Sequence, residues 1–149
     1  MTIDFDAKGK RRKRYTDRAE SFETERTVWL SAPLTSTSWD GDSFSTTAKT
    51  LIDLSAVFGA PAGIRAVYVR LYVNDSGSAG TSGLLLGLAP VDTAGLYMLS
   101  VMPSGLPNDY VAVEHGWVAC NADGDIYYQI SASGAGTFDV VMRIWGYMW

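Results

Sequence analysis

The chain has 149 residues, enough for one domain with a sizeable hydrophobic core. Apolar residues make up 47% of it and charged residues only 19%, against roughly 25% in an average domain, so we expect other protein to cover some of its surface. Its one cysteine, Cys120, excludes an intramolecular disulfide. No apolar stretch reaches the about 20 residues that cross a bilayer, and none follows the basic residues near the start, so we expect neither a membrane anchor nor a secretory signal.

The charge is unevenly distributed along the chain. Residues 1–26 contain eight Lys or Arg and six acids, a net charge of +2, whereas residues 27–149 contain four Lys or Arg and ten acids, a net charge of −6. Residues 1–26 hold too few apolar side chains to fold alone. The sequence therefore predicts an extended basic N-terminal arm at 1–26, attached to a domain at 27–149. The cluster at the centre of the arm consists of Lys8, Lys10, Arg11, Arg12, Lys13 and Arg14, followed by Tyr15.

The first elements of the domain follow from β-branched residues and breakers. Residues 27–30 (Thr-Val-Trp-Leu) predict a strand that ends at a bend at 32–33 (Ala-Pro). Residues 35–50 are mostly Thr, Ser, Asp and Gly, which indicates a polar connection, and residues 51–58 fit either a strand or one helical turn.

The clearest element is a strand over residues 65–74, where apolar and amphipathic side chains alternate with a period of two. We expect Val67, Val69, Leu71 and Val73 on one face, and Ala66, Tyr68, Arg70 and Tyr72 on the other.

The remaining strands are expected at 84–88, 95–102, 110–113 and 116–120. The Asp-Gly pair within 121–125 predicts a hairpin turn, and the Ser-Gly-Ala-Gly of 133–136 predicts a second hairpin, between 126–132 and 137–145. Seven or eight short strands at about ten-residue spacing, with almost no helical periodicity, predict an all-β antiparallel β-sandwich, jelly-roll-like, with an extended N-terminal arm.

No residue pattern typical of an active site is evident. The one histidine, His115, follows Glu114, and neighbours on a strand point to opposite faces, so the two are poorly placed to pair. We expect His115 on the surface or in a turn and Cys120 as a small buried apolar residue. The sequence predicts a protein that is not an enzyme and needs no cofactor.

Residues 121–125 could form a calcium site or a simple turn. Asn121, Asp123 and Asp125 offer oxygen ligands and could combine with Asp40 and Asp42, but the spacing and distal Glu of an EF-hand are missing. A turn is favoured, so no metal site is predicted.

The basic arm has four interpretations. It could bind nucleic acid through phosphate contacts, act as a nuclear localisation signal, dock on an acidic protein surface, or be a solvated tail. The acidic domain would repel a nucleic acid, and few aromatic residues accompany the arm. Docking on protein is therefore favoured over nucleic acid.

Two aromatic groups are candidate oligomer interfaces. Tyr68 and Tyr72 could form such an interface, a sugar platform, or the inner face of a second sheet. Trp145, Tyr147 and Trp149 end the chain and could be covered by another subunit or lie in a central strand.

Residues 52–67 (IDLSAVFGAPAGIRAV) and 121–130 (NADGDIYYQI) resemble, in texture, small virion proteins of tailed bacteriophages, including capsid decoration (cement) proteins and tail-fibre domains. The resemblance implies a non-enzymatic homo-oligomer, with a trimer as the favoured state, bound to other virion proteins such as the major capsid protein. On this interpretation the protein assembles in the host cytoplasm and resides in the virion, and its arm ties neighbouring subunits together. The alternatives are a tail-fibre or receptor-binding module that recognises a host glycan and, less favoured, a nucleic-acid-associated protein.

Overall fold

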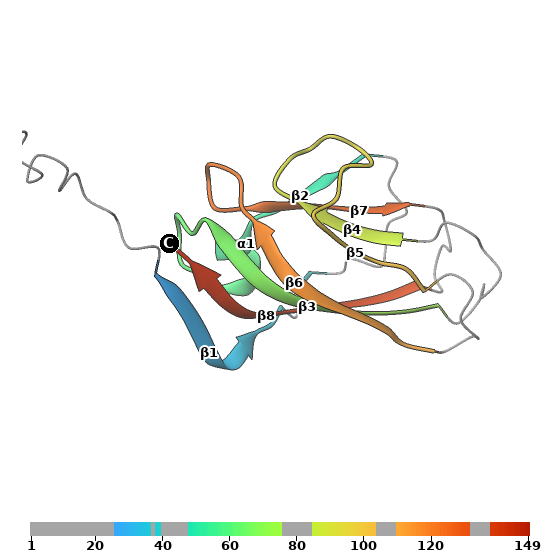
Figure 1. Cartoon of the computed structure of the whole chain (residues 1–149), viewed down its shortest axis with the longest axis horizontal. Coiled ribbons are helices and arrows are strands. Elements are labelled where there is room, and N and C mark those ends of the chain that lie inside the picture. Colours follow the sequence, from blue (N-terminus) through green and yellow to red (C-terminus); the bar gives the residue numbers. More distant parts are fainter. Residues whose placement is uncertain (1–25, 37, 40–47, 76–84, 104–109, 132–137) are drawn as a thin grey trace, which may run out of the picture.

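The computed structural model describes residues 26–36, 38–39, 48–75, 85–103, 110–131 and 138–149. These residues form two antiparallel sheets, packed as the two layers of a sandwich, and one short helix (Figure 1). The predicted all-β sandwich is confirmed. The elements are β1 (Thr27–Leu34), β2 (Thr50–Ile52), α1 (Leu54–Phe58), β3 (Ala66–Asp75), β4 (Leu85–Ala89), β5 (Leu99–Val101), β6 (Ala112–Ala119), β7 (Ile126–Ser131) and β8 (Phe138–Met148).

The order of the strands is that of a jelly roll. One sheet runs β1-β8-β3-β6 and the other runs β2-β7-β4-β5. The first strand thus pairs with the eighth, the second with the seventh, the third with the sixth and the fourth with the fifth, all antiparallel. This is one long hairpin rolled up so that alternate strand pairs fall into opposite sheets.

Both predicted hairpins are wrong. Strand β7 pairs with β2 and β4, while β6 pairs with β3, and β8 pairs with β1 and β3. The 121–125 turn therefore joins strands of different sheets, and β7 and β8 also lie in different sheets. The turn residues were recognised correctly, because Gly124 has a φ of 91°. A Gly-rich turn, however, can connect strands of two different sheets as well as the two strands of a hairpin. Only the long-range pairing of the strands distinguishes the two cases.

Other boundaries also differ from the prediction. The bend expected at 32–33 does not end β1, which continues to Leu34 with an irregular register after Trp29. Residues 51–58, left open between strand and helix, contain the end of β2 and then α1. The strand expected at 95–102 is reduced to β5, and the residues before it form a loop.

The core lies between the sheets and confirms the alternation in β3. Val67, Val69, Leu71 and Val73 are at most 1% exposed. They pack with buried residues of the opposite sheet and of α1, among them Ile52, Leu54, Leu86, Leu88, Ile126 and Ile130. Each fully buried aliphatic side chain contributes about 1.5–3 kcal/mol relative to exposure, so this layer stabilises the fold strongly.

Helix α1 closes one end of the core and is fixed at its start by a carboxylate. Asp53 Oδ1 accepts hydrogen bonds from Ala56 N at 2.8 Å and from Ser55 Oγ at 2.8 Å. These bonds, that of Ala56 above all, favour the charged form and lower the pKa of Asp53. A second carboxylate, Asp125, accepts from Leu54 N at 3.0 Å and so ties the β6–β7 turn to the helix.

Candidate binding face on the β1-β8-β3-β6 sheet

The outer face of the β2-β7-β4-β5 sheet is covered at β4 and β7 by the chain itself. The ring of Tyr97 lies over Gly87 of β4, where a Cβ atom would collide with it. The Tyr97 hydroxyl donates to Gln129 Oε1 at 2.9 Å, and Gly95 N donates to the same oxygen at 3.2 Å. The loop between β4 and β5 therefore buries Gln129, which is 5% exposed although it points away from the core.

Lys49 fixes this loop from the other side. Its Nζ donates to the carbonyl oxygens of Val91 (3.1 Å) and Leu96, and it stands 5.2 Å from the centre of the Tyr97 ring. Partial burial lowers the pKa of Lys49, although Asp92 nearby opposes the shift. The loop is thus held by hydrogen bonds and a cation–π contact.

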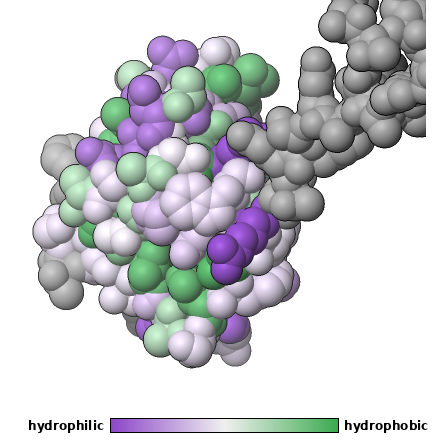
Figure 2. Space-filling model, turned by 90° about the vertical axis from the view of Figure 1, so that its left-hand side faces the viewer, coloured by the Kyte–Doolittle hydropathy of each residue, from purple (hydrophilic) through white to green (hydrophobic). Residues whose placement is uncertain are grey.

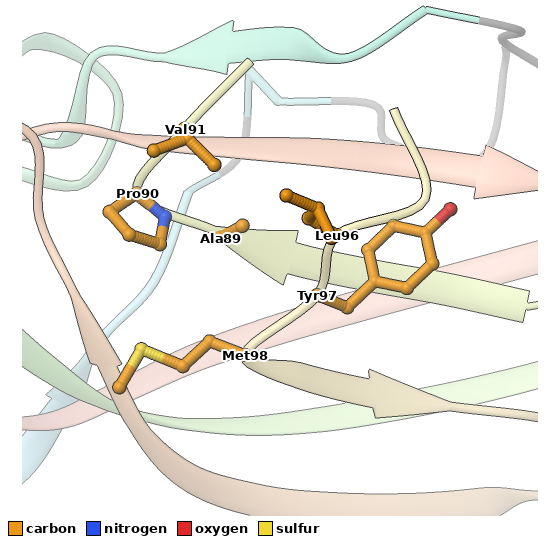
Figure 3. Close-up of a pocket in the computed structure, with 6 residues that line it drawn as sticks. All are labelled: Ala89, Pro90, Val91, Leu96, Tyr97 and Met98. Carbon is orange, nitrogen blue, oxygen red and sulfur yellow. The ribbon is translucent and has the colours of Figure 1, made fainter. Parts of the chain in front are cut away.

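A shallow hollow on this loop offers no chemistry. It has a volume of about 270 Å³ and is lined by Ala89, Pro90, Val91, Leu96, Tyr97 and Met98 (Figure 3). Tyr97 carries the one polar side-chain group of the lining, and that hydroxyl is already bonded to Gln129. The hollow is therefore an apolar surface depression without a candidate catalytic group.

The outer face of the β1-β8-β3-β6 sheet is built differently, around three aromatic rings. Trp29 of β1 contacts Tyr68 of β3 and Trp117 of β6, with centroids 5.0 and 5.6 Å apart, and Tyr68 lies 5.4 Å from Trp117. Trp29 can reach across β8 because its register partner is Gly146, whose missing side chain leaves room for the indole. Inclined aromatic pairs of this kind stabilise by about 0.5–1.5 kcal/mol each. Trp29 nevertheless remains 61% exposed.

Two arginines adjoin these rings. Arg70 of β3 is the direct register partner of Arg143 of β8, and both guanidiniums flank the ring of Tyr72, at 4.9 and 5.1 Å from its centre. Like charges directly opposite each other on a sheet are destabilising, so this arrangement disfavours the isolated fold. We call the surface formed by Trp29, Tyr68, Arg70, Tyr72, Trp117 and Arg143 the aromatic–arginine face.

The charge of this face is concentrated and uncompensated within the part of the chain that the structure describes. Residues 27–149 contain only four Lys or Arg, and two of them stand side by side here. Among the described residues no carboxylate forms a salt bridge with Arg70 or Arg143. Along β8 the next acid pointing outward is Asp139, four residues or about 13 Å from Arg143. A small positive site therefore stands on an acidic domain.

The structure divides the five predicted interface residues. Tyr68 and Tyr72 belong to the aromatic–arginine face, whereas Tyr147 packs against the core and touches Trp149 with ring centroids 5.9 Å apart. Trp145 is half-buried at the register shift of β8, and Trp149 is 42% exposed beside the start of β1. At the end of the molecule where the chain terminates, apolar and hydrophilic residues are interspersed (Figure 2).

The remaining predicted sites are the basic arm and the possible calcium ligands. The arm residues Lys8, Lys10, Arg11, Arg12, Lys13, Arg14 and Tyr15 lie outside the described residues, as do Asp40 and Asp42. Asn121 Oδ1 accepts from the backbone N–H groups of Asp123 and Asp125 at 3.0 and 2.9 Å, so this side chain shapes the turn. The described residues contain no group of three or more His, Cys, Asp or Glu arranged to hold a metal ion.

His115 lies on the surface as the sequence predicts, whereas Cys120, predicted to be buried, is only partly buried. His115 is exposed on β6, and the Glu114 carboxylate accepts from the backbone N–H of His115 at 3.0 Å. Cys120 is half-buried against the core, and this burial, with Asp125 nearby, raises the pKa of the thiol to about 12. A thiol with such a pKa is almost fully protonated at neutral pH and is a poor nucleophile.

No protein-family model matches the chain, and the search of curated proteins finds no match. In the described part of the chain, no helix has the length and apolar character needed to cross a membrane.

Sequence analysis recognised only part of the aromatic–arginine face. It placed Arg70 beside Tyr68 and Tyr72 through the alternation in β3, but assigned it no role. Trp29, Trp117 and Arg143 were missed because they come from strands far apart in sequence, and the register between strands brings them together. The signal available in the sequence was the scarcity of Lys and Arg in residues 27–149, which makes each of these four residues a candidate functional residue.

Proposed function

We propose that the chain is a non-enzymatic virion structural protein of a tailed phage, a capsid decoration (cement) protein that works as a homo-oligomer. In this proposal the aromatic–arginine face is its protein–protein interface, and the basic arm at 1–26 binds acidic surfaces of neighbouring virion proteins such as the major capsid protein. The observation that carries the proposal is the aromatic–arginine face, which no described residue covers.

The composition of the face supports a protein partner. Trp, Tyr and Arg are the residue types most enriched at the energetic centres of protein interfaces, and the six residues of the face are all of these types. The jelly-roll order adds support by analogy, since this fold is common in viral capsid proteins, although it also occurs in lectins and cupins.

The ring geometry favours a protein over a glycan as partner. A sugar-binding platform needs ring faces that lie flat and open along the surface, but Trp29, Tyr68 and Trp117 are inclined to one another by 59–70°. Rings inclined in this way offer a knobbed surface suited to side chains. The receptor-binding alternative therefore has the weaker geometric support.

The test is binding to particles. We expect the full-length protein to co-sediment with phage capsids that lack it, and Trp29→Ala to reduce the bound fraction by about tenfold or more, as loss of an interface hot spot does. Leu51→Ala is the matched control, because Leu51 is also an exposed apolar residue (47%) but lies on the other sheet. Absence of co-sedimentation by the wild-type protein would contradict the proposal.

A further inference from the structure

The aromatic–arginine face is unsuited to pairing with itself. A two-fold contact centred on the arginine pair would place Arg70 and Arg143 of one copy against the same pair of another copy, with no carboxylate of the face to compensate them. Like charges brought together in a desolvated interface are disfavoured by several kcal/mol. The occupant of the face must therefore carry negative charge as well as an apolar group.

The chain contains a segment of this chemistry. Residues 16–25, Thr-Asp-Arg-Ala-Glu-Ser-Phe-Glu-Thr-Glu, hold four acids and one Arg, a net charge of −3, around the single aromatic residue Phe22. The segment lies outside the described residues, immediately before β1. Its acids can pair with the two arginines while Phe22 packs on the exposed rings.

We propose that residues 16–25 of one copy bind the aromatic–arginine face of a neighbouring copy. This inference rests on the proposed function, because it supplies the contact that makes the protein a homo-oligomer. It also divides the arm in two: the acidic part holds the oligomer together, and the basic cluster before it stays available for an acidic virion partner.

The direction of the chain at Arg26 favours a neighbouring copy over the same copy. Trp149 N donates to Arg26 O at 3.3 Å, so the pairing of β1 with β8 continues outward past Thr27 and its partner Met148. Arg143 lies in the opposite direction, five residues or about 16 Å back along β8 from Met148. Residues 16–25 precede Arg26, so they would have to reverse direction to reach the face of their own copy. Binding to the face of another copy requires no such reversal.

The contact also limits the kind of assembly. Each copy gives one segment and receives one, so reciprocal exchange between two copies forms a dimer, and head-to-tail exchange forms a ring where the rotation between copies closes. A trimer is the small ring that the sequence analysis favours, and arm exchange forms it without a symmetric face-to-face interface.

Charge exchange within the full-length chain tests the inference. We expect Arg70→Glu/Arg143→Glu and Glu20→Arg/Glu23→Arg each to weaken self-association by about a hundredfold, because each leaves like charges facing one another. The combined four-site variant restores opposite charges with the same net charge as the wild type, and should regain the oligomer. The matched control, Arg11→Glu/Arg12→Glu, makes the same change in the basic cluster and should leave the oligomer intact.

The measurement is light scattering coupled to gel filtration, with circular dichroism to show that each variant is folded. An oligomer that survives both reversals, a combined variant that stays dissociated, or a wild-type protein that is monomeric overturns the inference. Loss of capsid binding but not of the oligomer in Arg70→Glu/Arg143→Glu also overturns it and assigns the face to another virion protein. Capsid co-sedimentation of the wild type separately decides whether the proposed function stands.

Discussion

The two sheets of the sandwich differ in what covers their outer faces. On the β2-β7-β4-β5 sheet, the loop before β5 lies on the strands, and Tyr97 and Lys49 hold it there through specific hydrogen bonds. On the β1-β8-β3-β6 sheet, an aromatic surface is left open by the described residues, with Trp29 61% exposed. The chain thus covers part of one outer face with its own loop, so the open face of the other sheet is best explained by a partner.

A glycine sits under an aromatic ring on each face. Gly87 leaves room for Tyr97, and Gly146 leaves room for Trp29. Both rings cross a strand that carries no side chain at that point. In the first case the ring is fixed by a hydrogen bond to a buried residue, and in the second it contacts other rings that are themselves partly exposed. The first arrangement serves stability, and the second presents a surface.

The largest loss of stability is expected on the buried side of β3, and its open side gives the comparison. Leu71→Ala removes a side chain that is 0% exposed and should lower the free energy of unfolding by about 2–5 kcal/mol. Tyr72→Ala, one residue away on the open face, loses mainly its cation–π contacts and should lower it by about 0.5–1 kcal/mol. Denaturant titrations of the two variants measure both values, and similar losses would show that the open face is part of the folding core.

The next effect concerns the covered face. Gly87→Ala places a methyl group where the Tyr97 ring lies, so the ring and its loop must move, and we expect a loss of about 1–3 kcal/mol. Gly116→Ala is the matched control on the open sheet, because its new methyl meets only the end of the Leu99 side chain, at 3.2 Å. Thermal unfolding of both variants compares them, and an equal loss would contradict the role of Tyr97 as the fixed cover.

Removal of the Tyr97 hydroxyl is a milder test of the same cover. Tyr97→Phe takes away one of the two hydrogen bonds received by Gln129 Oε1, and Gly95 N keeps the other. We expect a loss of about 0.5–1.5 kcal/mol and faster amide exchange in the β4–β5 loop, measured by hydrogen–deuterium exchange. Unchanged exchange in that loop would show that the hydroxyl does not hold it in place.

The smallest effect is one of pH, at the start of α1. Because the pKa of Asp53 is lowered in the folded state, its charge stabilises the fold above the ordinary carboxyl pKa, and this contribution is lost as the pH falls through the lowered value. Asp53→Asn keeps a capping side chain but has no charge to lose. The difference in denaturant midpoint between wild type and Asp53→Asn should therefore shrink between about pH 7 and pH 3. A difference in midpoint that stays constant with pH would contradict the stabilising role of the Asp53 charge.

Sequence analysis predicted the elements better than their partners. The alternation over 65–74 identified both faces of β3, since period-two burial is a local property of a strand. The jelly-roll pairing of the first strand with the last was left undecided, because it joins residues more than a hundred positions apart. The same limit made the hairpin prediction for β7 and β8 fail.

The candidate site shows this limit in more detail. Tyr68, Arg70 and Tyr72 share a face by local alternation, and that much was predicted. Arg143 joins them only through the register of β8, and Trp29 only because Gly146 lets it cross that strand. The uncompensated arginine pair is thus a property of the folded sheet.

The most direct test of the central claim, that another copy covers the open face, is the mass of the full-length protein in solution. Light scattering coupled to gel filtration should give three times the 16.2 kDa of one chain for the wild type, and one chain mass for Trp29→Ala at the same concentration. Leu51→Ala should keep the wild-type mass. A monomeric wild type, or a Trp29→Ala variant that remains fully trimeric, would contradict the account.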